Sequence, residues 1–258
     1  MLLVKQLFFI TALFYVIILL FMFFQQKRFI FFPTQTRHAP PPGGTEFIFE
    51  HDNVTLQGWM LQEKFAADRL IIYYGGNAED IYYATEQFSK YGDTAALLVN
   101  YRGYGGSTGT PGEKELFADA LAVFDEIVQR HAPEKIFLMG RSLGSGVASY
   151  VAANREVTGT ILITPFDSIA SIAKRQFPFL PTETLIQHPF RSIDFVQQFT
   201  APTLVIYGGR DTTVLPAQTR KLIEHIKGDT AIVYIEEAEH NNIELFDQYD
   251  LAILEFIQ

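Results

Sequence analysis

Short apolar runs alternate with longer amphipathic segments from about residue 69 to the end of the chain. RLIIYY (69–74) and AALLVNY (95–101) have the length of buried strands. The segment EKELFADALAVFDEIVQRH between two such runs has the apolar spacing of an amphipathic helix. Buried strands that alternate with helices are typical of parallel sheets. The pattern therefore predicts an α/β architecture, with a mostly parallel central sheet and helices on both faces.

The remaining elements extend this pattern in both directions. EFIFEH and VTLQGWML are expected to form a hairpin across Asp52 and Asn53, and a helix is expected from about Ala78 to Tyr91. Residues 165–200 interrupt the alternation with prolines and scattered aromatic residues, which predicts a small cap over the site. Further strands are expected at KIFLMG, GTILIT, TLVIYG and TAIVYIE, and a last helix at NIELFDQYDLAILEFIQ.

The N-terminal stretch LFFITALFYVIILLFMFF (7–24) carries no charged side chain. A helix of this length spans roughly 27 Å, close to the thickness of a bilayer core of about 30 Å. A cleaved signal peptide would need small residues just after the apolar run, but the chain continues with QQKR (25–28). We therefore expect residues 1–28 to be an uncleaved single-pass membrane anchor in contact with lipid. Basic residues lie on both sides of the span, so they favour a cytoplasmic domain only weakly.

The anchor is followed by the proline-rich and glycine-rich segment TRHAPPPGG, which is typical of an extended linker. The sequence predicts a linker over residues 29–44. One domain is expected over residues 45–258, with the cap inserted into it.

The stretch LMGRSLGSGVASYVAA (138–153) joins an expected strand to an expected helix. Gly140 and Gly144 stand two residues on either side of Ser142. Glycine tolerates the strained backbone of a very tight turn, and such a turn exposes the serine hydroxyl at a helix N-terminus. The G-x-S-x-G pattern predicts a nucleophile elbow, although a plain glycine-rich connection with a serine cap would give the same letters.

A nucleophilic serine needs a base and an acid that orients the base. Asp211 follows the expected strand TLVIYG, and His240 follows the last expected strand. Both would then lie at the carboxyl edge of the sheet together with Ser142, where open α/β sheets hold their active sites. Asp167 is the alternative acid and His188 the minor alternative base.

A developing oxyanion needs backbone N–H donors. Leu143, directly after the serine, is expected to supply one of them at the helix N-terminus. The second is expected from the loop YYGGNAED, at Asn77 or at the neighbouring Ala78.

The composition excludes several classes of function. The net charge of −9 argues against a nucleic-acid partner, and the absence of cysteine excludes disulfides, thiolate metal sites and a cysteine nucleophile. The glycine-rich segment NYRGYGGSTGTPGE lacks the P-loop pattern, so nucleotide binding is not expected.

These motifs resemble the membrane-associated α/β-hydrolase-domain family of the bud-emergence type, which includes protein depalmitoylases. The matching stretches are GGNAED, NYRGYGGSTGTPGE, GRSLGSGVA, TPFDSI, YGGRDTTV and EHNNIELF, and they span nearly all of the chain after residue 45. The resemblance implies an α/β-hydrolase fold and a serine hydrolase with Ser142 as nucleophile, Asp211 as acid and His240 as base. It implies neither a metal nor an organic cofactor.

Two positions depart from that family. Gly75 stands where members commonly carry histidine, and the N-terminal cysteine cluster of the eukaryotic depalmitoylases is replaced by the apolar span. The substrate is therefore not transferred from those enzymes.

The sequence favours hydrolysis of an ester or thioester by a Ser-His-Asp acyl-enzyme mechanism. The apolar residues of the cap suggest an apolar acyl group. A serine peptidase on the same fold and a membrane-tethered binding protein without turnover are the alternatives. All of the expected site residues lie in the domain, so a chain that begins near Gly43 is expected to keep its activity on short soluble esters.

Overall fold

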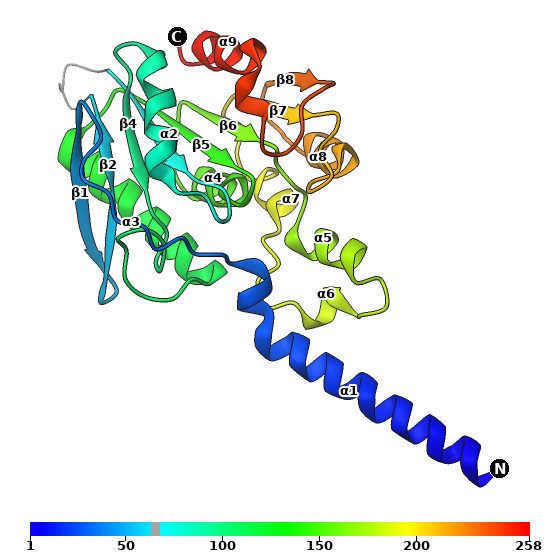
Figure 1. The fold of residues 1–258 in the computed structure, drawn as a ribbon. Helices are drawn as coiled ribbons and strands as arrows, with labels where there is room; N and C mark the ends of the chain where they lie inside the picture. Colours follow the sequence, from blue (N-terminus) through cyan, green and yellow to red (C-terminus); the bar gives the residue numbers. More distant parts are fainter. Residues whose placement is uncertain (63–67) are drawn as a thin grey trace.

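A computed structural model describes residues 1–62 and 68–258. In this part of the chain an eight-stranded sheet has the order β1-β2-β4-β3-β5-β6-β7-β8 (Figure 1). The first hairpin, β1 (Gly44–His51) and β2 (Val54–Leu61), joins the sheet antiparallel to β4, and all later pairs are parallel. The other strands are β3 (Arg69–Tyr74), β4 (Ala95–Val99), β5 (Lys135–Arg141), β6 (Gly159–Ile163), β7 (Thr203–Gly208) and β8 (Thr230–Ile235).

The central strands are buried on both faces. In β3, Ile72 and Tyr74 face one apolar cluster, whereas Ile71 and Tyr73 face a second cluster on the opposite side. The helices α3 (Glu113–His131) and α4 (Leu143–Asn154) contribute to the first cluster, and α2 (Ile81–Phe88) and α9 (Asp247–Phe256) contribute to the second. The predicted mostly parallel sheet with helices on both faces is therefore confirmed. The other short elements are η1 (Ser89–Tyr91), α5 (Ile169–Gln176), α6 (Thr182–Leu185), α7 (Ser192–Phe195), α8 (Pro216–Ile223) and η2 (Ile243–Leu245).

Within residues 45–258, the predicted turns and helices agree with the structure except at two boundaries. Asp52 and Asn53 both have positive φ, which matches the twist of a two-residue hairpin. Helix α2 begins at Ile81 rather than Ala78, because the Asp80 carboxylate accepts from the Tyr82 N–H and caps the helix there. The final helix is split into η2 and α9 at Phe246, which has extended backbone.

Residues 165–200 contain the three short helices α5, α6 and α7 between β6 and β7. Figure 1 shows α5 and α6 beside the C-terminal part of the N-terminal helix, away from β1 and β2. We call the segment of residues 165–200, which holds these three helices, the cap.

Helix α1 (Leu2–Ile30) projects from the body of the molecule and ends in it (Figure 1). Its 29 residues have a segment with mean hydropathy of 2.9, so it is long and apolar enough to cross a membrane. The N-terminal half is exposed, whereas half-buried side chains recur at helical spacing from Ile18 to Ile30. From Ile18 on, α1 therefore packs against the domain with one face, and before that residue the Tyr15 hydroxyl also reaches the domain, at the Phe179 carbonyl.

The chain after α1 does not leave the domain surface. Phe31 is 3% exposed and packs in the larger apolar cluster. His38 stacks on Tyr82 and lies 2.7 Å from the Asp80 carboxylate. The segment between α1 and β1 is irregular in backbone but is held against the loops at the carboxyl edge of the sheet.

Candidate active site

Ser142 lies at the turn between β5 and α4 with φ of 49° and ψ of −114°. This is a strained conformation for a residue with a side chain. A Cβ at Gly140 would lie 2.2 Å from the Gly144 carbonyl oxygen, and a Cβ at Gly144 would lie 1.9 Å from the Tyr74 carbonyl oxygen. Both glycines are thus required by the close approach of the backbone, as expected for a nucleophile elbow.

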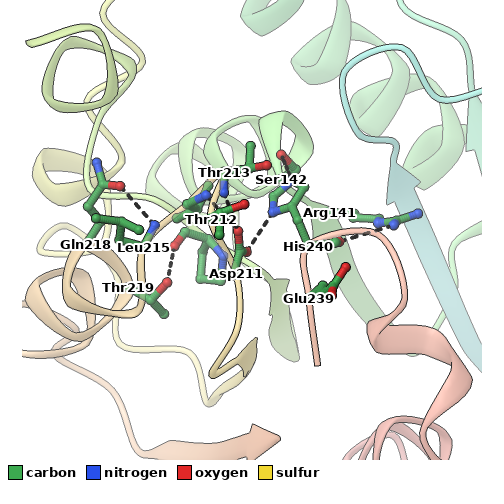
Figure 2. A network of polar contacts seen from close by, with 12 residues as sticks. Arg141, Ser142, Asp211, Thr212, Thr213, Leu215, Gln218, Thr219, Glu239 and His240 are labelled. Carbon is green, nitrogen blue, oxygen red and sulfur yellow. Dashed lines mark hydrogen bonds and ion pairs between the residues drawn. The ribbon is translucent and has the colours of Figure 1, made fainter. Parts of the chain in front are cut away.

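The imidazole of His240 connects Ser142 to Asp211. His240 Nε2 lies 2.9 Å from Ser142 Oγ, and His240 Nδ1 lies 2.7 Å from Asp211 Oδ2 (Figure 2). Because a carboxylate can only accept, Nδ1–H donates to Asp211 and Nε2 is left to accept from the serine hydroxyl. The three residues follow β5, β7 and β8, so the sheet brings them to one edge.

Asp211 is held from behind by its own turn. Its Oδ1 accepts from the N–H groups of Thr213 and Val214, both at 2.8 Å (Figure 2). The residue is 3% exposed, so its charge is compensated by hydrogen bonds rather than by water. One oxygen is thereby fixed by the backbone while the other faces the imidazole.

Arg141 holds the backbone beside His240. Its guanidinium donates to the His240 carbonyl oxygen at 3.4 Å and pairs with Glu244 at 3.5 Å and Glu79 at 3.9 Å. This side chain connects the elbow, the His240 loop and the loop after β3. The sequence analysis did not identify it, although its position next to the serine was visible.

The alternative acid and base lie elsewhere. Asp167 is buried, but its carboxylate accepts from the Ser171 hydroxyl and pairs with Lys221 at 2.8 Å. His188 is buried beneath Phe31, where its Nδ1 accepts from the Glu113 N–H at 3.3 Å. Burial lowers the pKa of His188, so the neutral ring is favoured. Neither residue contacts Ser142 or His240.

Two backbone donors lie beside Ser142. Within the described residues, the N–H groups of Leu143 and Asn77 have no hydrogen-bond partner, whereas the Ala78 N–H donates to the Asn77 side chain at 3.1 Å. We call the loop after β3, which holds Gly75, Gly76 and Asn77, the glycine loop. A Cβ on Gly76 would lie 3.8 Å from Ser142 Cβ, so this loop lies directly next to the serine. Of the two positions expected for the second donor, Asn77 is therefore the one with a free N–H.

The glycine loop is braced by a carboxylate. Glu79 accepts from the Gly76 N–H at 2.6 Å and from the Tyr73 hydroxyl at 2.7 Å, and Tyr101 donates to the Gly75 carbonyl at 2.8 Å. A Cβ at Gly75 would lie 2.8 Å from Ile81 Cγ2, so the space for a larger residue is filled. These contacts hold the loop in place at the position where the resembling family commonly has histidine.

The end of α1 is tied to the same loop. The Asn77 amide donates to the Ile30 carbonyl at 2.6 Å, and Asn77 Oδ1 accepts from the Phe32 N–H at 3.0 Å and from the Tyr104 hydroxyl at 2.8 Å. Helix ends leave carbonyl groups without intrahelical partners, and Asn77 satisfies one of them. We call Ile30, Phe31 and Phe32 the strap. Sequence reasoning missed it, because the helix pattern of α1 contains no signal for this contact.

A cavity of 710 Å³ opens beside Ser142 and His240. One wall comes from α1 and another from the cap. Polar side chains gather at the end that holds Ser142 and His240, and Gln26, Gln176 and Thr182 are the polar residues of those two walls. Gln26 joins the two walls, since it donates to the Leu185 carbonyl at 2.7 Å and accepts from the Gln187 N–H at 2.7 Å. The apolar lining includes Met22, Phe29, Ile30, Ile169, Ile172, Phe177, Leu180, Leu185 and Ile186.

The described residues contain no group of three or more His, Cys, Asp or Glu side chains that could hold a metal ion.

Comparisons with known proteins agree with this architecture. A family model described as an alpha/beta hydrolase domain matches residues 105–245. An uncharacterized protein of Mycobacterium tuberculosis is 31% identical over 212 residues, which cover 80% of this chain and 75% of that protein. Human alpha/beta hydrolase domain-containing protein 17B is 29% identical over 192 residues, which cover 72% of this chain and 65% of that protein.

The fold also matches solved structures. An esterase from Pyrococcus furiosus superposes with a TM-score of 0.69 at 19% identity, over 87% of this chain and 95% of that chain. At this identity the likeness concerns the fold alone. The predicted α/β-hydrolase fold is confirmed, and the chain belongs to the alpha/beta hydrolase domain family.

Proposed function

We propose that this chain is a membrane-anchored serine hydrolase that cleaves esters or thioesters of an apolar acyl group. The observation that carries the proposal is the chain of hydrogen bonds from Asp211 through His240 to Ser142 at the polar end of an apolar cavity. Residues 1–28 would be the anchor, residues 29–44 the connection and residues 45–258 the catalytic domain, with the cap at about 165–200.

Ser142 attacks the acyl carbonyl carbon while His240 Nε2 takes its proton. Asp211 keeps the imidazole in the required tautomer and stabilises the imidazolium that forms. His240 then gives the proton to the departing alkoxide or thiolate, which leaves an ester on Ser142. Water adds to this ester with His240 again as base, and the acid and the free serine are released.

The negative charge that develops on the carbonyl oxygen needs fixed donors. The free N–H groups of Leu143 and Asn77 are our candidates, since both border the cavity next to Ser142. Leu143 opens helix α4, so its N–H also carries the positive end of the helix dipole.

The cavity supports an apolar acyl group. Beyond Ser142 its walls are mostly aliphatic and aromatic side chains of α1 and the cap, with Gln26, Gln176 and Thr182 as the polar members. Each methylene group that such a wall removes from water contributes roughly 0.8 kcal/mol to binding. A longer acyl chain should therefore bind more tightly until the cavity is filled.

The nucleophile can be tested with a fluorophosphonate probe on the full-length protein in detergent. One serine should be labelled, and Ser142→Ala should remove both labelling and turnover without a loss of folded protein. Ser89→Ala, at an exposed hydroxyl remote from His240, is the matched control and should label normally. Labelling that persists in Ser142→Ala would refute the assignment.

The bond that is cleaved can be tested with one acyl group presented as an oxygen ester, a thioester and an amide. We expect turnover of the ester or the thioester and little of the amide. Preferred cleavage of the amide would indicate the peptidase alternative, and no turnover of any of the three by a probe-reactive protein would contradict the hydrolase proposal.

A further inference from the structure

The loop between α5 and α6 has the sequence FPFLP (177–181) and carries no polar side chain. We call it the cap loop. Its two sides face different surroundings: Phe177 and Leu180 line the cavity beside Ser142, whereas Phe179 is 65% exposed. Exposure of the apolar Phe179 ring to water is energetically unfavourable, and the neighbouring Pro178 and Leu180 add no polar side chain that would offset it.

The cap loop touches α1 at a residue whose depth can be inferred. The Tyr15 hydroxyl donates to the Phe179 carbonyl at 2.8 Å. A membrane-crossing segment needs about 17 to 25 residues. Every stretch of 18 residues within Leu2–Ile30 includes Tyr15, because the helix has only 29 residues. Wherever the bilayer core lies along α1, Tyr15 is therefore inside it, and Phe179 is at the same depth.

Irregular backbone is tolerated in hydrocarbon only where its polar groups have partners. Pro178 and Pro181 have no N–H, while the N–H groups of Phe177 and Leu180 donate to the carbonyls of Ala173 and Phe177. The Phe179 carbonyl is satisfied by Tyr15. Within the described residues, the Phe179 N–H and the Pro178 carbonyl are the backbone groups of the loop without a partner, and the polar contact that the loop makes with α1 satisfies the exposed Phe179 carbonyl.

The charged residues that flank the loop are also paired. Lys174 lies 2.8 Å from the Glu183 carboxylate, and the Arg175 guanidinium donates to the Thr213 carbonyl at 2.8 Å. A paired lysine and glutamate have no net charge, and long basic side chains can extend toward headgroups while their stems remain in apolar surroundings.

We propose that the cap loop enters the bilayer beside α1, with Phe179 in contact with lipid hydrocarbon. The inference rests on α1 being a membrane helix, as in the proposed function. It makes the cap loop a partition, with the acyl cavity on one side and lipid on the other. It does not depend on which bond the enzyme cleaves.

The absence of cysteine from the chain permits a direct test in the full-length protein. Three single substitutions, Phe14→Cys, Phe179→Cys and Leu251→Cys, replace exposed apolar residues in α1, in the cap loop and in α9. Figure 1 shows α9 far from α1, so Leu251 is the control for the aqueous surface. Each variant is labelled with a nitroxide, reconstituted into phosphatidylcholine vesicles, and its collisions with oxygen and with a water-soluble nickel chelate are compared.

Oxygen concentrates in hydrocarbon, whereas the nickel chelate remains in water. We expect the ratio of oxygen to nickel-chelate collisions at 179 to be several-fold above the ratio at 251 and close to that at 14. A ratio at 179 equal to that at 251 would overturn the proposal. A label at 179 shielded from both reagents would also overturn it, since it would indicate packing against a second protein copy.

The label at 14 separates the anchor from the cap loop, because residue 14, like Tyr15, belongs to every stretch of 18 residues within α1. An aqueous ratio at 14 would show that α1 is not in the bilayer, and the cap-loop proposal would then fail together with the anchor. Fluorophosphonate labelling of the same variants reports on the hydrolase proposal independently. If Phe179→Cys does not fold, Phe179→Trp gives the same test. Brominated lipids should quench the fluorescence of the introduced tryptophan more strongly than that of the buried Trp59. Leu180 is not a substitute position, because it lines the cavity.

Discussion

One end of the cavity beside Ser142 is built by the sheet, and the other is built by α1 and the cap. At the sheet end, Ser142 and Asp211 follow β5 and β7, which are paired on both sides. His240 follows the edge strand β8, which pairs with β7. At the anchor end, Met22 and Gln26 come from a helix that contacts the domain with one face only. We expect the sheet end to determine whether a bond is broken and the anchor end to determine which acyl group fits.

The largest effect should come from the sheet end. Asp211→Asn should leave the imidazole without its orienting acceptor, and kcat should fall by about 10⁴-fold. Asp167→Asn, at a carboxylate that is equally buried but bound to Ser171 and Lys221, should cost much less. Hydrolysis of a short soluble ester gives kcat, and thermal unfolding controls for folding. A greater loss with Asp167→Asn would move the acid into the cap.

The next effect should come from the strap, where the two ends meet. Asn77→Ala keeps the backbone N–H but removes the side chain that binds Ile30 and Phe32. Loss of an oxyanion donor costs about 10²- to 10³-fold in kcat, so a displaced donor should cost roughly tenfold or more. KM for a short ester should change little. Tyr104→Phe, which removes one of the contacts to Asn77 Oδ1, should show a smaller loss in kcat.

A chain that begins near Gly43 provides a related comparison. The sequence alone predicts that it keeps its activity on short esters, whereas the structure predicts a loss at least as large as that of Asn77→Ala, because the strap and one cavity wall are removed with the anchor. Full activity of the shortened chain on short esters would show that the strap does not position Asn77.

A smaller and more selective effect is expected at the far wall. Met22→Ala should weaken the contact with long acyl chains by about 1 kcal/mol, which corresponds to several-fold in kcat/KM, and should leave acetyl esters unchanged. Phe14→Ala, on the part of α1 that does not line the cavity, should change neither. The readout is kcat/KM over a series of acyl lengths, and an equal change at all lengths would contradict the assignment of this wall.

The smallest effect on turnover is expected beneath the strap, where a buried carboxyl changes the stability of the protein instead. Burial raises the pKa of Glu113 to about 7 from a usual value of 4.5. The folded state therefore holds this proton more tightly, so stability falls as the pH rises from about 4.5 to 7 and remains lower above that. Glu113→Gln should remove a cost on the order of 2 kcal/mol at pH 8 and change little at pH 4.5.

Thermal unfolding at the two pH values measures this difference. Glu237→Gln, at an exposed position, should change the unfolding temperature at neither pH. A Glu113→Gln protein that is no more stable than the wild type at pH 8 would show that the carboxyl finds compensation there.

The sheet end could be predicted from the sequence because its geometry is local. Ser142 directly follows an apolar run, and Asp211 and His240 come shortly after the next two, in the loops beyond β7 and β8; parallel strands bring such positions to one edge. The sheet and most of its elements follow from the same pattern. Asn77 as a candidate donor was also visible, since its glycine neighbours mark the loop.

The anchor end could not be predicted, because its contacts join residues far apart in the chain. An apolar stretch such as α1 is apolar on every side, so its sequence does not indicate which face meets the cap. The bond from Asn77 to Ile30 uses a backbone carbonyl, which every residue has. Glu79 was missed for a similar reason, since a lone carboxylate near a glycine loop is usually solvated.

The strap also determines how the enzyme would meet a substrate that diffuses in the same membrane. A flexible tether would let the domain rotate freely relative to the membrane. Here α1 ends at Ile30 and the next residue, Phe31, is already buried in the core of the domain. The mouth of the cavity would then keep a constant angle to the membrane plane. Encounters would be two-dimensional, and their rate would follow the mole fraction of substrate among the lipids rather than its concentration in the surrounding volume.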